Sequence, residues 1–516
     1  MTDLKKYEFK LPKAGQPAVG ATTGWGRPSG APLQATVAPT SDALPSDPAA
    51  CLARGNAWLQ NGRVEDALRA YDRAIALKPD YLDPHFNRGN ALLRLQRLPE
   101  ALADFERAAE LSPELAIAHY NRATILATLG RVAEAMAGYQ RTLALDPTMV
   151  QARFNLGNLY QQQGDAEQAL ACMDAVIAQS PNVAQAHINR GTALLSLKRP
   201  SDAGQSFDRA LALQAQSPEA LINRANARLQ LKHYDAAAKD LNEALRLNPK
   251  LVPARRLLGA LLRETGEAEQ ALAELQQAYD LAPDTPGALS DLVATLAMTC
   301  DWQRLPQGIA RLEAAVREGR SGVAPLVVLD LIDSPDLQLA SARLAVAADC
   351  PPSASLGPLV RRTGGGKIRV GYYSPDFHDT AVARQVAELL DRHDRGQFEW
   401  LAFAYGPIPH DDAVRARLRK SFDQFHDLRD SSDHEVARKS REMGIDIAVD
   451  LSGFGPGGRL GMFAHRCAPV QISYLGYPGS TGADYMDYVI ADEVALPPAA
   501  HAQFSEKVVT LPHSHQ

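Results

Sequence analysis

The feature that most constrains this chain is a 34-residue period in its first half. The same position of the period is proline in six repeats and alanine in one: Pro79, Pro113, Pro147, Pro181, Ala215, Pro249 and Pro283. Small and large residues recur at other offsets with the same interval, which chance spacing of proline would not produce. The period therefore predicts a stack of similar supersecondary units, each buried against its neighbours, in place of one globular core.

Three further offsets of the period indicate pairs of packed helices. Small residues recur where two helices must approach closely: Gly55, Gly89, Ala123, Gly157, Gly191, Ala225 and Gly259. Alanines recur for the same steric reason: Ala67, Ala101, Ala135, Ala169, Ala203, Ala237 and Ala271. Large residues fill the space that the small ones leave: Tyr71, Phe105, Tyr139, Met173, Phe207, Leu241 and Leu275. This pattern is typical of tetratricopeptide repeats (TPR), and it predicts seven helical hairpins that stack into a superhelical solenoid with a concave groove.

A row of asparagines lies on the first helix of successive repeats. Its members are Asn87, Asn121, Asn155, Asn189 and Asn223. A carboxamide both donates and accepts hydrogen bonds, so such a row can bind the backbone of an extended peptide whatever its side chains. The alternative is that these asparagines bond within or between repeats. We expect the row to bind extended protein segments, and a homo-oligomer formed through the TPR surface is a further expectation.

Composition limits the class of protein. The 516-residue chain carries 54 basic and 60 acidic side chains, and a net charge of −6 argues against non-specific nucleic-acid binding. No stretch approaches the roughly 20 apolar residues of a membrane span, and the charged N-terminus lacks the apolar segment of an export signal. The five cysteines lie far apart without C-x-x-C spacing, which argues against a disulfide framework and a zinc site. We therefore expect a cytoplasmic protein that uses no membrane, nucleic acid or metal.

Shifts in composition divide the chain into four segments. Residues 1–46 are rich in Pro, Gly, Ala, Ser and Thr, and we expect them to be disordered. Residues 47–284 hold the repeats, and residues 285–366 keep helical apolar spacing without the period, which predicts a helical connector. In residues 367–516 short apolar runs alternate with amphipathic stretches, which predicts a doubly wound domain with a mostly parallel sheet. The expected fold is an α-solenoid followed by an α/β Rossmann-like lobe.

The last segment offers six candidate strands and four candidate helices. The strands are Ile368–Tyr373, Phe398–Ala404, Ile445–Leu451, Val470–Leu475, Tyr488–Ala491 and Lys507–Leu511. The helices are Val382–His393, Asp412–Phe422, Ser432–Met443 and Leu460–His465. Ligands of such sheets bind beyond the carboxyl ends of the strands. The expected ligand-facing loops are therefore Ser374–Arg384, Ser452–Arg459 and Gly476–Asp484.

The middle loop contains a G-x-G-x-x-G pattern over Gly453–Gly458. This pattern follows the third candidate strand and not the first, and no acidic residue stands about 20 positions on, so it fails as a dinucleotide fingerprint. We interpret it as a turn whose glycines let backbone amides approach an anionic or sugar group. Binding of another nucleotide through this loop remains a third, separate hypothesis.

Six sequence blocks and Arg459 carry a resemblance to a known family. The blocks are Cys300-Asp301-Trp302, Ile368–Phe377, Asp450–Gly453, Ala468–Gln471, Leu475–Gly482 and Met486-Asp487-Tyr488. In order and spacing they resemble the protein O-linked N-acetylglucosamine (O-GlcNAc) transferase family. The resemblance implies that the solenoid presents a protein to a catalytic region of two Rossmann-like lobes, which transfers GlcNAc from UDP-GlcNAc to Ser or Thr with inversion and without a metal or other cofactor. It also implies these residues on the donor side of the cleft: Asp376, Gly453, Arg459, Gln471, Tyr477, Pro478, Gly479 and Thr481.

Two departures from the family pattern bear on activity. Thr380 and Arg384 hold the places of two histidines in the family's loop after the first strand. His378 is displaced from the first of these places by two positions; it is a weak catalytic candidate, and we expect it to be an ordinary surface loop residue. Neither Thr380 nor Arg384 titrates near neutral pH, so the catalytic acid or base is unknown. The resemblance also ends with the first lobe, so we expect the second lobe and its UDP contacts to be missing. The sequence leaves open a transferase-like chain of doubtful activity by itself and a non-catalytic peptide-binding scaffold.

Overall fold

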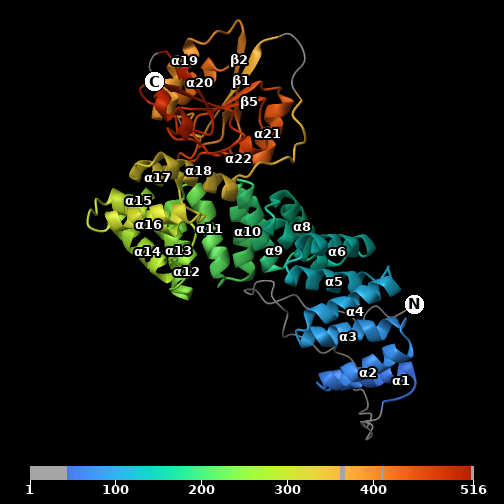
Figure 1. Ribbon diagram of the computed structural model, residues 1–516. Helices are drawn as coiled ribbons and strands as arrows, with labels where there is room; N and C mark the ends of the chain where they lie inside the picture. The colour runs from blue at the N-terminus through green and yellow to red at the C-terminus, as the bar shows by residue number, and fades with distance from the viewer. Residues whose placement is uncertain (1–43, 361–365, 410, 513–516) are drawn as a thin grey trace. The chain divides into compact units, whose positions relative to one another are not determined.

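The computed structural model of the chain describes residues 44–360, 366–409 and 411–512 (Figure 1). The segment expected to be disordered, residues 1–46, lies almost wholly outside the described residues. The chain divides into two compact units, residues 1–190 and 191–516.

The N-terminal unit is built from helices that pair in chain order (Figure 1). The helices are α1 (Pro48–Gln60), α2 (Val64–Leu77), α3 (Leu82–Arg94), α4 (Leu98–Leu111), α5 (Ala116–Thr128), α6 (Val132–Leu145), α7 (Val150–Gln162) and α8 (Ala166–Gln179), and α9 (Ala184–Ser196) spans the division between the units. Helix α1 packs on α2, α3 on α4, α5 on α6 and α7 on α8, and each hairpin packs on the next. These are the helical hairpins that the 34-residue period predicts.

Glycine on the first helix of a hairpin makes room for a large side chain on the second. A Cβ atom added at Gly55 would lie 2.5 Å from the Tyr71 ring, and one added at Gly89 would lie 3.0 Å from the Phe105 ring. Tyr71 and Phe105 are both fully buried. Because protein interiors are close-packed, these pairs set the distance between the two helices.

The C-terminal unit contains further repeat helices, then connector helices and an α/β domain. Its repeat helices are α10 (Pro200–Leu213), α11 (Pro218–Gln230), α12 (Tyr234–Leu247), α13 (Val252–Glu264) and α14 (Ala268–Leu281). The connector helices are α15 (Ala288–Met298), α16 (Leu305–Arg317), α17 (Pro325–Leu331) and α18 (Pro335–Asp349). Leu275 of α14 shares one apolar core with Leu292, Leu312 and Val328 of the connector. The connector is therefore packed directly onto the last repeat.

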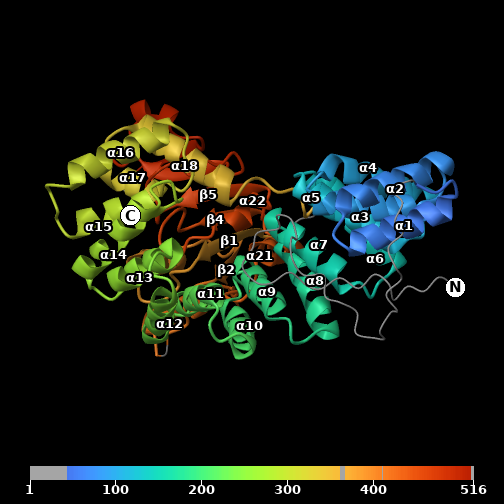
Figure 2. The same ribbon diagram turned by 90° about the horizontal axis from the view of Figure 1, so that it is seen from below.

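Seven parallel strands form the sheet of the α/β domain; the labels β5, β4, β1 and β2 follow one another in sheet order in Figure 2. They are β1 (Ile368–Ser374), β2 (Phe398–Ala404), β3 (Gln424–Asp427), β4 (Ile447–Asp450), β5 (Val470–Tyr474), β6 (Tyr488–Asp492) and β7 (Lys507–Leu511). Their order across the sheet is β3-β2-β1-β4-β5-β6-β7, and each neighbouring pair is parallel. In register, Tyr372 of the central strand β1 lies between Ala402 of β2 and Val449 of β4. Strand β3 was not expected from the sequence.

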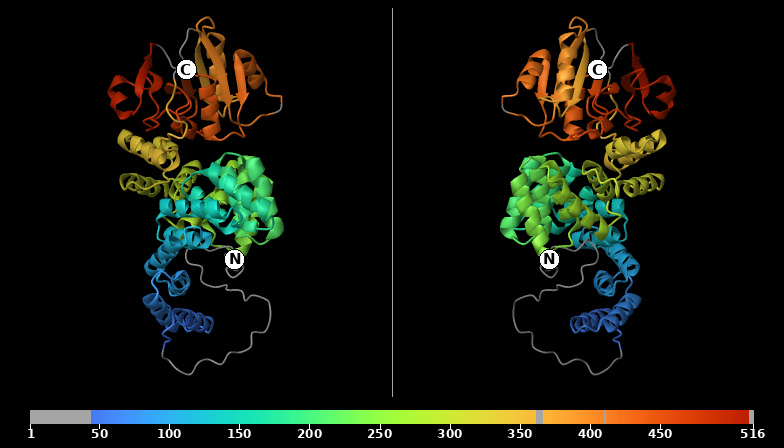
Figure 3. Two further views of the ribbon diagram at one scale, coloured as in Figure 1. Left: turned by 90° about the vertical axis from the view of Figure 1, so that its right-hand side faces the viewer. Right: turned by 90° about the vertical axis from the view of Figure 1, so that its left-hand side faces the viewer.

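Helices cover both faces of the sheet (Figure 3). The helices are α19 (Ala381–Asp391), α20 (Ala413–Ser421), α21 (Asp433–Glu442) and α22 (Gly461–Ala464), with a 3-10 helix, η2 (Pro498–Gln503), before β7. Tyr372 packs with Val386 of α19, whereas its neighbour Tyr373 packs with Val436 of α21. Successive side chains of β1 thus enter opposite cores, as expected of a buried parallel strand.

Candidate functional site

The order of the strands reverses between β1 and β4. From β1 the chain proceeds through β2 to the edge strand β3, then returns past β1 to β4 and continues to β7 on the other side. At such a reversal the loops on either side diverge, and this is where ligands of open α/β sheets bind. The loops selected from the sequence follow β1, β4 and β5, so they lie at this edge.

Close contacts between glycines and their neighbours bring these three loops together. A Cβ atom added at Gly457, in the loop after β4, would lie 3.3 Å from Pro375 in the loop after β1. One added at Gly453 would lie 2.5 Å from Tyr477 in the loop after β5. Gly453 also has a φ of 51°, which favours glycine. We call the residues on these three loops the candidate site.

Asp450 shapes the start of the loop after β4. Its side chain accepts hydrogen bonds from the backbone N–H groups of Ser452 and Gly453, each at 3.0 Å. Asp450 is only 1% exposed. Burial raises the pKa of its carboxyl from 3.8 to about 6, against the opposing effect of the two N–H donors. The turn that carries Gly453 is therefore held by a buried group that titrates near neutral pH.

Tyr477, Pro478 and Gly479 form the turn after β5. The Tyr477 ring packs edge-to-face on Phe454 of the neighbouring loop, with centroids 5.5 Å apart. Burial raises the pKa of Tyr477 above its ordinary value. Pro478 is exposed, and a Cβ atom added at Gly479 would lie 3.0 Å from the Tyr477 ring. These three predicted residues do come together with Gly453 in the candidate site.

Thr481 serves as an anchor of the same loop. It is fully buried, and its N–H group donates to Oε1 of Glu506 at 2.7 Å. Its hydroxyl donates to the same carboxylate oxygen. The structure thus directs the polar atoms of Thr481 towards Glu506.

Arg459 and Gln471 are also committed to bonds inside the domain. The Arg459 guanidinium donates to Oδ1 of Asp433 at 2.7 Å and to the Ser431 carbonyl at 2.8 Å. The Gln471 side chain is fully buried: its Oε1 accepts from the Cys467 N–H at 2.7 Å, and its Nε2 donates to two backbone carbonyls. In this structure both predicted side chains brace the loops and the helix α22. Arg459 stands at the end of the loop that carries Gly453, whereas Gln471 lies within β5, outside the three loops.

The loop after β1 contains the predicted residues Asp376, His378, Thr380 and Arg384. Asp376 is half-buried, and burial raises the pKa of its carboxyl above the ordinary value. The backbone N–H of His378 donates to the Asp376 carbonyl at 2.7 Å. Thr380 caps α19, because its hydroxyl oxygen accepts from the Ala383 N–H at 3.2 Å. Arg384 is exposed, where it forms an ion pair with Asp379.

Metal-binding clusters and membrane-spanning helices are both absent from the part of the chain that the structure describes. Within residues 44–360, 366–409 and 411–512, no group of three or more His, Cys, Asp or Glu side chains is arranged to hold a metal ion. In the same part of the chain, none of the helices has the length and apolar character needed to cross a bilayer.

Comparison with known families identifies the α/β domain. Residues 358–516, which contain the sheet and the candidate site, match the sequence model of glycosyl transferase family 41. The α/β domain belongs to glycosyl transferase family 41. Tetratricopeptide-repeat models match residues 55–96, 86–150, 154–218 and 218–251. The resemblance inferred from the sequence blocks is confirmed.

Curated relatives of the family 41 domain are named as UDP-N-acetylglucosamine–peptide N-acetylglucosaminyltransferases. The probable enzyme SEC of Arabidopsis thaliana is 31% identical over 241 residues, which cover 43% of this chain and 24% of that protein. A Caenorhabditis elegans enzyme of the same name is 34% identical over 152 residues, which cover 29% of this chain and 13% of that protein. This chain therefore spans about a quarter or less of the length of these relatives.

Solved structures similar to this chain include an O-GlcNAc transferase and a TPR protein. A mutant of the Thermobaculum terrenum O-GlcNAc transferase has 25% identity and a TM-score of 0.41, and the match covers 64% of this chain and 59% of that one. YrrB, described as a TPR protein with an unusual peptide-binding site, has 24% identity and a TM-score of 0.31, with coverage of 35% and 93%.

Two residues of the family 41 domain that touch the candidate site were missed from the sequence. Tyr405 follows β2, and the Arg459 guanidinium lies over its ring, 5.4 Å from the centroid. A polar residue at the carboxyl end of a strand is the signal that marks Tyr405. Glu506 binds Thr481 but precedes the amino end of β7, where nothing in the sequence draws attention to it.

The predicted row of asparagines forms hydrogen bonds between repeats. The Asn87 amide donates to Oδ1 of Asn56 in the preceding repeat at 2.9 Å, and that of Asn189 donates to Asn158 at 2.7 Å. Asn155 donates to the hydroxyl of Tyr139 at 3.3 Å. Of the other two, Asn121 is buried and Asn223 half-buried. The alternative role foreseen for this row, bonding between repeats, is therefore present in the structure, and peptide binding stays a prediction.

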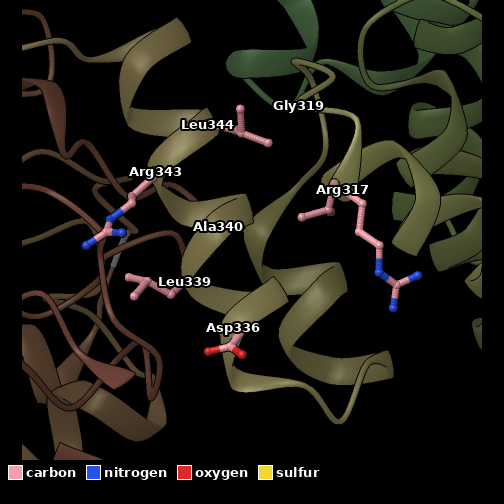
Figure 4. Close-up of a pocket in the computed structure, with 8 residues that line it drawn as sticks. Arg317, Gly319, Asp336, Leu339, Ala340, Arg343 and Leu344 are labelled. Carbon is pink, nitrogen blue, oxygen red and sulfur yellow. The ribbon is translucent and has the colours of Figure 1, made fainter. Parts of the chain in front are cut away.

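A surface hollow of about 430 Å³ lies apart from the predicted residues, between α16 and α18 (Figure 4). It is lined by Val316, Arg317, Gly319, Asp336, Leu339, Ala340, Arg343 and Leu344. The Arg317 and Arg343 side chains point away from one another. None of the residues expected to bind donor or peptide lines this hollow.

Proposed function

We propose that this chain acts in the transfer of GlcNAc from UDP-GlcNAc to serine and threonine hydroxyls of extended protein segments. The observation that carries the proposal is the meeting of the loops after β1, β4 and β5 at the reversal of strand order, in a family 41 domain. The names of the curated relatives supply the donor and the acceptor class. The repeats ahead of the domain supply a surface for the acceptor protein.

The transfer involves three changes in bonding. The acceptor oxygen attacks the anomeric carbon, the bond from this carbon to the diphosphate oxygen breaks, and the hydroxyl proton passes to a base of the protein. The glycine-rich turn over Gly453–Gly458 lets the loops after β1, β4 and β5 pack closely, because added Cβ atoms would meet Pro375 and Tyr477. We place the sugar or phosphate of the donor beside this turn. Asp376 is the proton acceptor that the geometry supports best, because it is half-buried after β1 and its raised pKa makes it a stronger base than an exposed aspartate.

The bonds of the asparagine row are compatible with a role in holding the acceptor protein. A carboxamide has two N–H donors and two acceptor lone pairs, so one bond to the preceding repeat leaves capacity for a peptide backbone. The bond from Asn87 to Asn56 also fixes the orientation of the Asn87 amide before a peptide arrives. Such pre-organisation lowers the entropy cost of binding.

The cysteines support a reducing location for this activity. All five, Cys51, Cys172, Cys300, Cys350 and Cys467, are free thiols. Disulfides persist in oxidising compartments and are rare in the cytosol. We therefore assign the chain to the cytoplasm as part of the proposal.

One observation favours a second candidate function, a peptide-binding scaffold without transfer activity. The two positions where the family resemblance implies histidines hold Thr380 and Arg384, and both have other roles here. Thr380 caps a helix, and Arg384 pairs with Asp379 at the surface. Neither side chain accepts a proton near neutral pH. If Asp376 does not take over this role, the chain binds protein segments and transfers nothing.

The test uses the purified 516-residue chain with titration calorimetry and a radiolabel assay. We expect UDP and UDP-GlcNAc to bind and NAD not to bind, and GlcNAc to pass from labelled UDP-GlcNAc to an unstructured Ser/Thr peptide. Asp376→Asn should reduce transfer by at least about 100-fold, in the range typical of a lost general base. The matched control is Asp379→Asn, which makes the same charge change at an exposed neighbour.

Three results decide between the candidates. Peptide binding with no labelled product would support the scaffold and contradict transfer. Binding of NAD with no binding of UDP would contradict both family-based functions. Equal transfer by Asp376→Asn and Asp379→Asn would show that another group takes the proton.

A further inference from the structure

Glu506 is a buried carboxylate whose bonding partners all come from two short stretches of chain. It is 4% exposed and lies just before β7. Its Oε1 accepts from the N–H and the hydroxyl of Thr481, and its Oε2 accepts from the hydroxyls of Ser480, at 2.6 Å, and Ser505, at 3.1 Å. No Lys or Arg forms an ion pair with Glu506 among the described residues. All four donors to its side chain are neutral groups.

Two of these donor residues belong to the loop after β5. Ser480 also accepts from the backbone N–H groups of Gly482 and Ser505, both at 3.1 Å, so the cluster continues into the backbone on both sides. A buried polar group costs free energy unless it is hydrogen-bonded. The donors of the loop and the acceptor oxygens of Glu506 therefore pair with one another. Removal of either side would leave buried polar groups of the other side without hydrogen bonds.

The loop is pinned at its two ends by backbone packing. Gly476 lies directly against the carbonyl of Leu451 at the start of the loop after β4. A Cβ atom added at Gly482, where φ is 67°, would lie 2.8 Å from the backbone nitrogen of Arg343 in the connector helix α18. Between these ends the chain turns through Tyr477 and Pro478 at the candidate site. The bonds to Glu506 hold this middle part.

We propose that Glu506 is a positioning residue of the candidate site: through Ser480 and Thr481 it fixes the turn that presents Tyr477 and Pro478 to the ligand. The ligand at this site, UDP-GlcNAc, comes from the proposed function, on which this part of the inference rests. Glu506 itself is too buried to touch a ligand. Its effect on binding must therefore pass through the loop.

The decisive variant is Glu506→Gln, which keeps the size of the side chain. It replaces one acceptor oxygen by an NH2 group, which then faces an N–H or O–H donor of the loop. We expect amide hydrogen exchange over residues 476–484 to become faster by on the order of tenfold, as for the loss of one buried bond. We expect the Kd for UDP-GlcNAc, measured by calorimetry, to rise by a similar factor of about ten.

The matched control is Glu493→Gln, because Glu493 is an exposed glutamate in the segment after β6. It makes the same chemical change without touching the loop, so it should match the unsubstituted chain in both measurements. Exchange in β1 and β4 serves as an internal reference for global unfolding. If Glu506→Gln does not fold, Ser505→Ala removes one donor from the same carboxylate and should give a smaller change in the same direction.

The possible results separate this inference from the proposed function. Unchanged exchange over residues 476–484 in Glu506→Gln would overturn the inference. Faster exchange with an unchanged Kd would also overturn it, because the loop would then not govern the site. If the unsubstituted chain binds no UDP-GlcNAc, the proposed function fails, and the exchange data alone decide whether Glu506 holds the loop.

Discussion

Arg224 in α11 forms a bidentate ion pair with Asp240 in α12, with Nε 2.9 Å from Oδ2 and Nη2 2.6 Å from Oδ1. The Asp240 side chain is only 6% exposed, and Arg228 donates to it as well, at 2.6 Å. In the N-terminal unit, Arg88 forms the same bidentate pair with Asp104. Both pairs join residues 16 apart on the two helices of one hairpin. The repeats therefore use buried charge pairs as well as complementary shapes to join their helices.

We expect Asp240→Asn to lower the free energy of unfolding by about 2–4 kcal/mol, because two guanidinium groups lose a buried partner. Urea unfolding followed by circular dichroism measures this change. Asp208→Asn is the control, since Asp208 binds the same Arg224 from a side chain that is 59% exposed. It should cost less than about 1 kcal/mol. An equal loss of unfolding free energy in the two variants would contradict the claim that the buried ion pair stabilises more than the exposed one.

We expect Gly259→Ala to destabilise the chain, although alanine is the better helix former. The added methyl would lie 2.5 Å from Cγ of Leu275, which is 1% exposed and cannot move aside easily. Such overpacking costs about 1–3 kcal/mol and exceeds the helix-propensity gain of about 1 kcal/mol. At Gly204 in α10 an added Cβ meets nothing within 4 Å, so Gly204→Ala should stabilise by about 0.5–1 kcal/mol. Thermal unfolding of both variants should give shifts of opposite sign.

The periodic part of the fold was accessible from the sequence because its contacts repeat. Pairs such as Gly259 and Leu275 recur at one fixed interval, so the same helix packing can be predicted independently from each repeat. Strand β3 lacks such a signal: Gln424 to Asp427 contains one aromatic residue among polar ones and no apolar run. It forms at the edge of the sheet because β2 offers it a partner, and this depends on tertiary structure.

The candidate site could be predicted as a set of loops but not as a set of exposed side chains. The loops after β1, β4 and β5 lie at one edge of the sheet, as predicted, because strand alternation fixes which loops share an edge; that this edge binds the ligand stays a prediction. Whether a side chain in these loops faces a ligand depends on partners far along the chain. Thr481 is held by Glu506 and Arg459 by Asp433, 25 and 26 residues away. No local pattern reveals such pairs.

We expect Asp450 to make stability depend on pH between about 4 and 6. Its pKa is about 6 in the folded chain and near 3.8 when unfolded, so the folded state binds the proton more tightly. Its stabilising contribution is fully present below pH 4 and is lost as the pH rises through 6. The shift of roughly two units corresponds to about 3 kcal/mol.

The measurement compares unfolding free energies of the unsubstituted chain and Asp450→Asn from pH 4 to pH 8. Subtraction removes the contribution of every other titrating group. The free energy of the unsubstituted chain should fall relative to that of the variant up to about pH 6–7 and then stay constant. A difference that does not change across this range would show that Asp450 titrates like an exposed aspartate.

Thr380 should matter for the stability of α19, although it stands where the family resemblance implies a histidine. Its hydroxyl accepts the Ala383 N–H and donates to the Asp376 carbonyl at 3.0 Å, so it ties the cap of α19 to the loop after β1. We expect Thr380→Ala to cost about 1–2 kcal/mol and Thr380→Ser to cost much less, because serine keeps the hydroxyl. Arg384→Ala, at an exposed position of the same helix, should stay within about 0.5 kcal/mol. Chemical unfolding of the three variants tests this order, and a tolerated Thr380→Ala would show that the cap does not stabilise the helix.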